Sequence, residues 1–348
     1  MLGKIYKLFS NNIGIDLGTV NTLVYLGGHG IIINEPSVVA VNQKTDQIVA
    51  IGSDAKQMLG RTPAHIKAIR PLIDGVISDF EVTEEMLRYL INKAEGMNKK
   101  IFRPRVVVGV PVSITSVETR AVYDATKSAG AREVYIIQEP MAAAIGIGLP
   151  VMDPVGSMIV DIGGGTTDIA VISLGGIVKA KSLKVAGDRL NSDVISYLKD
   201  EFKLLIGDRT ADAVKIAIAT AVISPSLEAE VRGRDLITGL PKSVILTDSD
   251  IREAIRGSLN ILTEGVKEVL EVTPPELLAD IIHRGITLVG GGALLKGTAD
   301  LLRQALKVPV KVAPDPLTAV ARGTGIVLED FNTYKNILFT VLEDEPLR

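Results

Sequence analysis

Short apolar, β-branched runs that end at glycine turns recur along the 348 residues of the chain, at residues 13–15, 106–110, 158–160 and 286–289. Such runs are typical of buried parallel strands that end in tight turns. Helix-start patterns lie between them, because Thr115 with Glu118 and Thr273 with Glu276 each have the spacing of a capping box. A third helix is expected from Thr83 to about residue 94. This alternation of strands and helices predicts an α/β fold.

Three motifs occur twice in the same order. A strand, an aspartate, a glycine turn and a hydroxyl residue lie at 13–19 and 159–167. A strand and its turn lie at 106–111 and 286–293, and an acid–proline start to a small-residue helix lies at 139–146 and 315–323. Repetition at this scale predicts two homologous lobes. We expect lobe I at 1–150 with an insertion at about 34–78, lobe II at 151–330 with an insertion at about 186–252, and a segment 331–348 that packs back on lobe I. The small-residue helices should cross closely and act as the hinge between the lobes.

Composition narrows the class of protein. The net charge of −3 argues against a nucleic-acid-binding protein, which usually carries a basic excess. The absence of cysteine excludes disulfides and cysteine-ligated metals, and the three histidines lack ligand-like spacing. No apolar run reaches the ~18–20 residues that span a bilayer, and we recognise no signal peptide, so we expect a cytoplasmic protein. The mean hydropathy of +0.31 is high, which indicates buried parallel strands together with surface used for self-association or a membrane.

The first glycine turn has the chemistry of a phosphate site. A tight turn of this kind presents several backbone N–H groups on one side, and such a nest binds phosphate oxygens. Asp16 would place negative charge beside the phosphates, which is unfavourable unless a cation lies between them. The arrangement therefore implies Mg²⁺, held mostly through water because this ion dehydrates reluctantly. An ordinary hairpin is the alternative interpretation. The residues assigned to this loop are Gly18, Thr19, Val20 and Asn21.

The second turn contains three consecutive glycines, which carry a large entropic cost and usually mark a close approach of the backbone to a ligand. Asp161 precedes them and would be the second metal carboxylate, while the Thr166 hydroxyl after them could orient a water molecule or a phosphate. A third glycine loop follows the strand at 286–289, where it could let an adenine ring lie against bare backbone; a plain strand–helix turn is the alternative. These two loops comprise Gly163, Gly164 and Gly165, and Gly290, Gly291, Gly292 and Ala293.

Glu139 is the candidate for activating water. Pro140 biases Glu139 to an extended conformation just before a helix. A carboxylate held there could order a water molecule for in-line attack on a γ-phosphate. The alternative is a helix-start carboxylate that the helix dipole stabilises.

Together these features resemble the ATPase superfamily of actin, heat-shock chaperones and sugar kinases. Longer runs are similar to the bacterial actin family that includes MreB and Mbl, over about residues 11–330. The residues that carry this resemblance lie at 16–23, 34–40, 56–63, 74–80, 139–144, 205–207 and 273–277. Asp168 and residues 169–173 resemble the Mbl branch more closely.

The resemblance implies an actin-like ATPase fold, with two duplicated lobes and four subdomains around a nucleotide cleft. It implies a slow ATPase that binds ATP or ADP with Mg²⁺ and forms filaments with itself. Such filaments would bind inner-membrane lipid and organise lateral cell-wall synthesis with partners such as RodZ, MreC and MreD. Glu139 and Thr166 match the pair that positions the hydrolytic water. Lys215 and Asp212 match a nucleotide-binding pair, although Asp212 is one methylene shorter than the family's glutamate.

Two segments are candidates for membrane contact. Apolar residues at helical spacing near the N-terminus, and an apolar pair between cations at 99–105, suit the boundary between lipid headgroups and acyl chains. The alternative is a frayed leader and a packed strand start. These residues are Leu2, Ile5, Tyr6 and Phe9, and Ile101 and Phe102.

Two other functions fit the superfamily. A sugar-type small-molecule kinase would need a catalytic base and polar groups around an acceptor hydroxyl. The insertion at 34–78 consists mostly of apolar and structural residues, so we find no convincing acceptor site there. A heat-shock-type chaperone would need a peptide-binding domain, for which the 348 residues leave no room.

Overall fold

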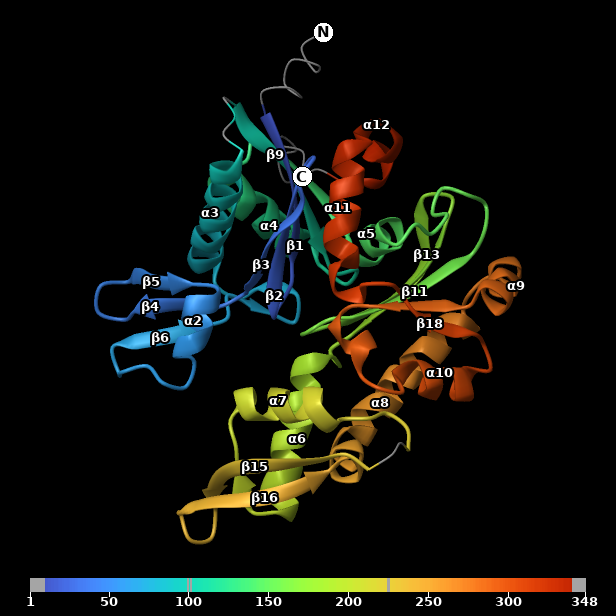
Figure 1. The fold of residues 1–348 in the computed structure, drawn as a ribbon. Helices are drawn as coiled ribbons and strands as arrows, with labels where there is room; N and C mark the ends of the chain where they lie inside the picture. Colours follow the sequence, from blue (N-terminus) through green and yellow to red (C-terminus); the bar gives the residue numbers. More distant parts are fainter. Residues whose placement is uncertain (1–9, 99, 101, 224–225, 340–348) are drawn as a thin grey trace. The chain divides into compact units, whose positions relative to one another are not determined.

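The computed structural model of the protein describes residues 10–98, 100, 102–223 and 226–339. Internal contacts divide the chain into two compact units (Figure 1). Unit 1 comprises Met1–Val155, Ile172–Ile177 and Leu317–Arg348, and unit 2 comprises Gly156–Val171 and Val178–Pro316. That the two repeats correspond to independent lobes with the expected boundaries stays a prediction.

Unit 1 is built on a five-stranded sheet with the order β10-β9-β1-β2-β3. The first three strands form an antiparallel meander, and β9 and β10 run parallel to β1. Helices α3 and α4 pack on one face and α5 and α11 on the other (Figure 1). Burial on both faces explains why the central strands are nearly continuous apolar runs. The elements are β1 Ser10–Leu17, β2 Asn21–Leu26, β3 Gly30–Pro36, β9 Phe102–Val110, β10 Glu133–Gln138, α3 Phe80–Met97, α4 Ser116–Ser128, α5 Glu139–Gly146 and α11 Ala319–Glu329.

The first insertion forms a small sheet of its own, with the order β5-β4-β6. Helix α2 packs against it, and Val38, Ala40 and Ala55 form its buried centre. A two-stranded ribbon of β7 and β8 leads back to α3. The bounds are β4 Val39–Asn42, β5 Gln47–Ile51, α2 Ser53–Met58, β6 Ile66–Ile69, β7 Leu72–Ile73 and β8 Val76–Ile77.

Unit 2 repeats the topology of unit 1. Its five-stranded sheet has the order β13-β12-β11-β17-β18, in which β11, β17 and β18 are parallel. Read from the other end, β18, β17, β11, β12 and β13 occupy the places of β10, β9, β1, β2 and β3. This confirms the predicted duplication. The elements are β11 Ser157–Ile162, β12 Thr167–Ser173, β13 Gly176–Leu183, β17 Ile286–Val289, β18 Val310–Val312, α9 Pro275–Arg284 and α10 Thr298–Leu306, with short 3-10 turns η1 Gly291–Leu294 and η2 Pro316–Thr318.

The second insertion combines a three-stranded sheet, β14-β15-β16, with helices α6, α7 and α8 (Figure 1). Its apolar side chains continue without a break into the core of the unit 2 sheet. The bounds are α6 Gly187–Glu201, β14 Leu204–Leu205, α7 Asp208–Ile218, β15 Glu228–Asp235, β16 Pro241–Thr247 and α8 Asp248–Glu271.

The helices expected after Thr115 and Thr273 both form, but only the first has its expected capping box. Thr115 caps α4, and its side chain and that of Glu118 form both reciprocal bonds of a capping box. Helix α3 begins earlier than expected, because Asp79 accepts a hydrogen bond from the Val82 N–H and so caps it at Phe80. Helix α9 has no side-chain cap, since the Thr273 hydroxyl donates instead to the Val269 carbonyl at 2.6 Å.

The two small-residue helices cross as closely as expected. A Cβ added at Gly146 would lie 1.9 Å from the Ala319 carbonyl oxygen, and one at Gly323 would lie 1.7 Å from that of Ala142. The two backbones are therefore in direct contact, which only glycine permits. The hinge role of these helices stays a prediction.

The end of the described chain lies on unit 1. Short turns α12 Phe331–Tyr334 and η3 Lys335–Ile337 follow α11. The ring of Phe331 packs edge-on against Tyr135, with centroids 4.9 Å apart, and the Arg105 guanidinium lies 4.3 Å from the Phe331 ring. Within residues 10–98, 100, 102–223 and 226–339, no helix is long and apolar enough to cross a membrane.

Candidate functional site

The first glycine turn joins β1 to β2 at one edge of the unit 1 sheet. A Cβ at Gly18 would lie 2.5 Å from the Asn21 carbonyl oxygen, so the turn requires glycine there. Thr19 is buried, and its hydroxyl accepts a hydrogen bond of 2.9 Å from the Gly75 N–H. Ser37 braces the same turn, because its hydroxyl donates to the Gly18 carbonyl and its N–H to that of Val20. These hydrogen bonds fix the shape of the loop.

Asp16 and Glu139 are brought together on this sheet by strand register. Asp16 on β1 pairs with Gly109 on β9. Glu139 begins α5 directly after β10, and its Cγ would lie 3.4 Å from a Cβ at Gly109. Glu139 therefore lies at ordinary van der Waals distance from the Gly109 position, the residue that pairs with Asp16. Parallel strands place their carboxyl ends at one edge, where ligands of open α/β sheets bind.

Burial raises the pKa of the Asp16 carboxyl to about 7. A carboxylate in this position is costly without a partner of opposite charge, because its desolvation is not repaid. A cation held near Asp16 would remove that cost. The chemistry of this group therefore fits the predicted Mg²⁺.

The second glycine turn and the third glycine loop meet in unit 2. Asp161 is 7 % exposed on β11 and pairs with Val289 at the end of β17. A Cβ at Gly290 would lie 2.4 Å from the Asp161 Oδ1, and one at Gly292 only 2.1 Å from Ile162 Cγ2. Glycine in this loop lets its backbone lie directly against the strand that carries the aspartate.

Helix α6 supports the second turn from the other side. The N–H groups of Gly187 and Asp188 donate to the carbonyls of Gly163 and Gly164 at 3.2 and 2.8 Å. The Gly163 N–H in turn donates to the Thr166 carbonyl at 2.9 Å, which closes the hairpin. Thr166 itself is buried. These hydrogen bonds fix the shape of the second turn.

Helix α7 brings Asp212 and Lys215 to the start of α6. The Lys215 ammonium lies 3.0 Å from the Asp212 carboxylate and donates to the Gly187 carbonyl at 3.1 Å. Lys215 is largely buried, whereas the Asp212 side chain is 43 % exposed. Unit 2 thus gathers the second turn, the third loop and this pair around one edge of its sheet.

Few side chains that could bind a metal lie close together. Within the residues that the structure describes, no group of three or more His, Asp or Glu side chains could enclose a metal ion. Single aspartates such as Asp16 and Asp161 suit an ion that keeps its waters and is bound mainly through phosphate oxygens, as Mg²⁺ often is. The residues present fit such a metal, whose binding here stays a prediction.

The predicted membrane residues fall mostly outside the described part of the chain. Leu2, Ile5, Tyr6, Phe9 and Ile101 all lie there. Phe102 begins β9 and is 38 % exposed.

Comparison with known proteins identifies the family. The model of the MreB/Mbl protein family matches residues 10–336. The chain belongs to the MreB/Mbl family. It is 49 % identical over 330 residues to the cell shape-determining protein Mbl of Bacillus subtilis, covering 93 % of this chain and 98 % of Mbl. It is also 49 % identical over 345 residues to the cell shape-determining protein MreB of Escherichia coli, covering 98 % and 99 %.

Solved structures agree with this assignment. MreB5 of Spiroplasma citri bound to ADP superimposes with a TM-score of 0.89 at 38 % identity, over 94 % of this chain and 98 % of MreB5. The same protein bound to AMPPNP gives a TM-score of 0.87. A MamK double helical filament gives 0.79 at 23 % identity, which supports the fold alone. The actin-like fold predicted for this MreB/Mbl chain is confirmed.

Sequence reasoning missed several residues that shape the loops of this MreB/Mbl protein. Ser37, Gly75 and Gly187 hold the first and second turns, yet none was assigned to the site. Ser37 and Gly75 lie within the family-like runs at 34–40 and 74–80, which was the available signal. Gly187 lies between the second turn and Lys215, and no local pattern marked it.

Proposed function

We propose that this protein is an ATP-binding cytoskeletal protein that assembles into filaments and maintains rod shape. The observation that carries the proposal is the gathering of Asp161, the second and third glycine loops and Lys215 at one sheet edge of unit 2. Near full-length identity to cell shape-determining proteins supports the same function. A slow ATPase activity would couple nucleotide state to assembly.

The predicted loops and side chains of the two units would have separate tasks. The glycine turns would offer backbone N–H groups to the phosphates, because preformed nests of this kind bind anions without reorganisation. Mg²⁺, when bound, would neutralise phosphate charge beside Asp16 and Asp161. The Gly290–Ala293 loop, with Asp212 and Lys215, would hold the nucleoside. Glu139 and Thr166 would position the water that attacks the γ-phosphate.

Filaments are expected to form by head-to-tail contacts between identical copies, since such contacts do not close on themselves. They would lie on the cytoplasmic face of the cell membrane and organise lateral cell-wall synthesis. Each apolar side chain that enters lipid contributes at most ~1.5–3 kcal/mol, and each nearby cation about 1 kcal/mol. A single copy would therefore bind weakly, while a filament would bind through many copies at once.

High-speed sedimentation tests the assembly. With ATP and Mg²⁺ the protein should pellet above a critical concentration, and without nucleotide it should pellet less. If light scattering finds monomers at every concentration, in solution and on liposomes, the cytoskeletal function is wrong.

Flotation with anionic liposomes tests the membrane contact separately. Deleting residues 2–9 and introducing Ile101→Ser with Phe102→Ser should abolish co-flotation but preserve ATP-dependent assembly in solution. Flotation equal to that of the parent protein would place the attachment elsewhere.

A further inference from the structure

A connecting segment, residues 219–223, follows helix α7 and lies beside the chain that follows the third glycine loop. Thr220 is fully buried and pairs with Lys296 in a parallel bridge, and the Ala221 N–H donates to the Lys296 carbonyl at 2.7 Å. Lys296 follows the Gly290–Ala293 loop by three residues. The segment therefore links the helix that carries Asp212 and Lys215 to that loop.

The two chains approach each other closely. Gly297 has a φ of 81°, and a Cβ there would lie 2.6 Å from Val222 Cγ2 and 3.1 Å from its N atom. A side chain at position 297 would push the connecting segment away from the loop. Small displacements of this segment would thus be passed on to α7, whose last turn is bonded to it through the Ala219 N–H and the Lys215 carbonyl at 3.0 Å.

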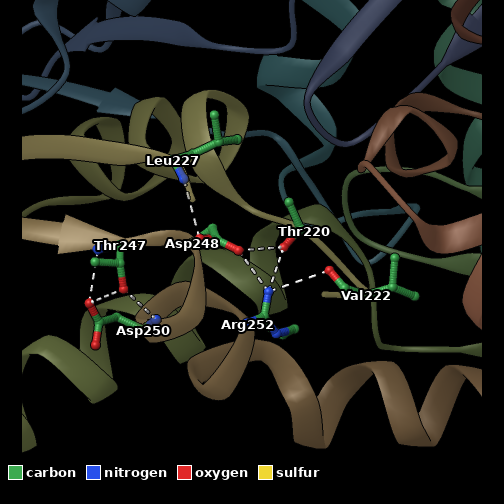
Figure 2. Close-up of polar contacts among 7 residues, drawn as sticks. All are labelled: Thr220, Val222, Leu227, Thr247, Asp248, Asp250 and Arg252. Carbon is green, nitrogen blue, oxygen red and sulfur yellow. Dashed lines mark hydrogen bonds and ion pairs between the residues drawn. The ribbon is translucent and has the colours of Figure 1, made fainter. Parts of the chain in front are cut away.

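An ion pair near the start of α8 also holds the connecting segment, as Figure 2 shows. The Arg252 Nη1 lies 2.8 Å from Asp248 Oδ2 and donates to the Thr220 hydroxyl at 2.9 Å and to the Val222 carbonyl at 3.4 Å. One guanidinium nitrogen therefore joins α8 to two points on the segment.

Asp248 completes the arrangement. Its Oδ1 accepts a hydrogen bond from the Leu227 N–H at 3.3 Å (Figure 2). The Asp248 N–H in turn donates to the Leu227 carbonyl at 2.9 Å. The residue is only 4 % exposed. Thr247 caps the helix just before it with a capping box to Asp250, which holds this turn in place. The ion pair thus has a rigid base.

A partly buried ion pair contributes little to stability alone, because the desolvation of its charges offsets much of their attraction. The pair instead favours one conformation of the connecting segment, because the hydrogen bonds of Arg252 to its acceptors form in only one arrangement of that segment. Its main effect is therefore on the position of the connecting segment.

We propose that Asp248 and Arg252 are positioning residues that hold the connecting segment and so fix α7 against the Gly290–Ala293 loop. The proposal rests on the proposed function, in which α7 and this loop bind the nucleoside. Neither residue needs to touch the nucleotide. Loss of either should weaken binding of the nucleoside part, while the phosphate part, held by the second turn and α6, keeps its affinity.

The test compares binding of Mg–ATP with binding of Mg–tripolyphosphate by calorimetry, at a temperature where each variant is folded. The variants are Arg252→Gln, Asp248→Asn and the gentler Thr220→Val, which keeps its shape and removes one hydroxyl. Arg256→Gln is the matched control, because Arg256 lies on the same helix in an exposed ion pair with Glu253. Single-turnover hydrolysis at saturating ATP is measured in parallel.

For Arg252→Gln and Asp248→Asn we expect the Kd of ATP to rise about tenfold, the size of a typical coupling between sites. Thr220→Val should give a smaller rise, and Arg256→Gln none. The Kd of tripolyphosphate and the single-turnover rate should stay at the parent values. An unchanged Kd of ATP with a lower melting temperature would make the pair merely structural and overturn the proposal. An equal loss for both ligands would also overturn it. If the parent protein fails to bind ATP, the proposed function itself fails.

Discussion

Replacing Gly323 by alanine should force α5 and α11 apart. The added Cβ would lie 1.7 Å from the Ala142 carbonyl oxygen, whereas Cβ atoms essentially never come closer than 3.0 Å to another heavy atom. The helices must therefore separate by about 1.3 Å at this point. Helix α11 cannot yield easily, since a Cβ at Gly14 would lie only 2.2 Å from the Thr324 hydroxyl oxygen and α11 is thus packed directly on β1.

The size of the effect follows from two opposing contributions. Overpacking a close contact costs typically about 1–3 kcal/mol, while alanine in place of glycine inside a helix gains about 0.5–1 kcal/mol. A clash with backbone lies at the upper end of the first range, about 3 kcal/mol, so a net loss of about 2–2.5 kcal/mol is expected. In a unit of about 190 residues this lowers the melting temperature by roughly 4–10 °C.

Thermal unfolding followed by circular dichroism measures this shift, with Gly257→Ala as the control. Gly257 lies in helix α8, and a Cβ there meets no atom within 4 Å. That variant should be as stable as the parent or slightly more stable. A Gly323→Ala protein that melts at or above the parent temperature would refute the steric argument. An equal loss in both variants would show that the clash is not its cause.

Four further results are expected. Glu139→Ala should slow phosphate release by ~10²–10⁴-fold with ATP affinity nearly unchanged, and unchanged turnover would remove this residue from the mechanism. Asp161→Asn should weaken the Mg²⁺ dependence of ATP binding, so titrations with and without Mg²⁺ that match the parent would contradict its metal role. The hydrogen bond from Arg252 lowers the pKa of Asp248 below its ordinary value of 3.8, so the charged form stabilises the native state above that pH. This stability is lost as the pH falls through the lowered pKa, and the difference in free energy of unfolding between the parent and Asp248→Asn, from urea titrations, should shrink from pH 7 toward pH 3. Thr115→Ala should cost about 1 kcal/mol, and an unchanged urea midpoint would show that its capping box contributes nothing.

Local signals in the sequence predicted much of this protein. Strand runs, glycine turns and the capping box at Thr115 depend on neighbours within a few residues, and the structure has them where they were expected. The repeat predicted two sheets of the same topology because each copy carries its own strand and turn pattern. Prediction failed at the capping box expected at Thr273, because the Thr273 hydroxyl has a competing acceptor one turn back in α8.

Contacts between segments that lie far apart in the sequence could be identified only from the tertiary structure. No local pattern in the sequence predicts that the Thr19 hydroxyl accepts a hydrogen bond from the Gly75 N–H. None predicts that Glu139 lies beside Gly109. These pairs follow from strand register and from the path of the insertions. The same holds for Arg252 and Thr220, which lie 32 positions apart. The sequence by itself determined the elements, the duplicated pattern and the candidate loops. Only the packing of the folded chain decided which side chains hold those loops in place, because such contacts depend on the arrangement of whole elements rather than on local spacing.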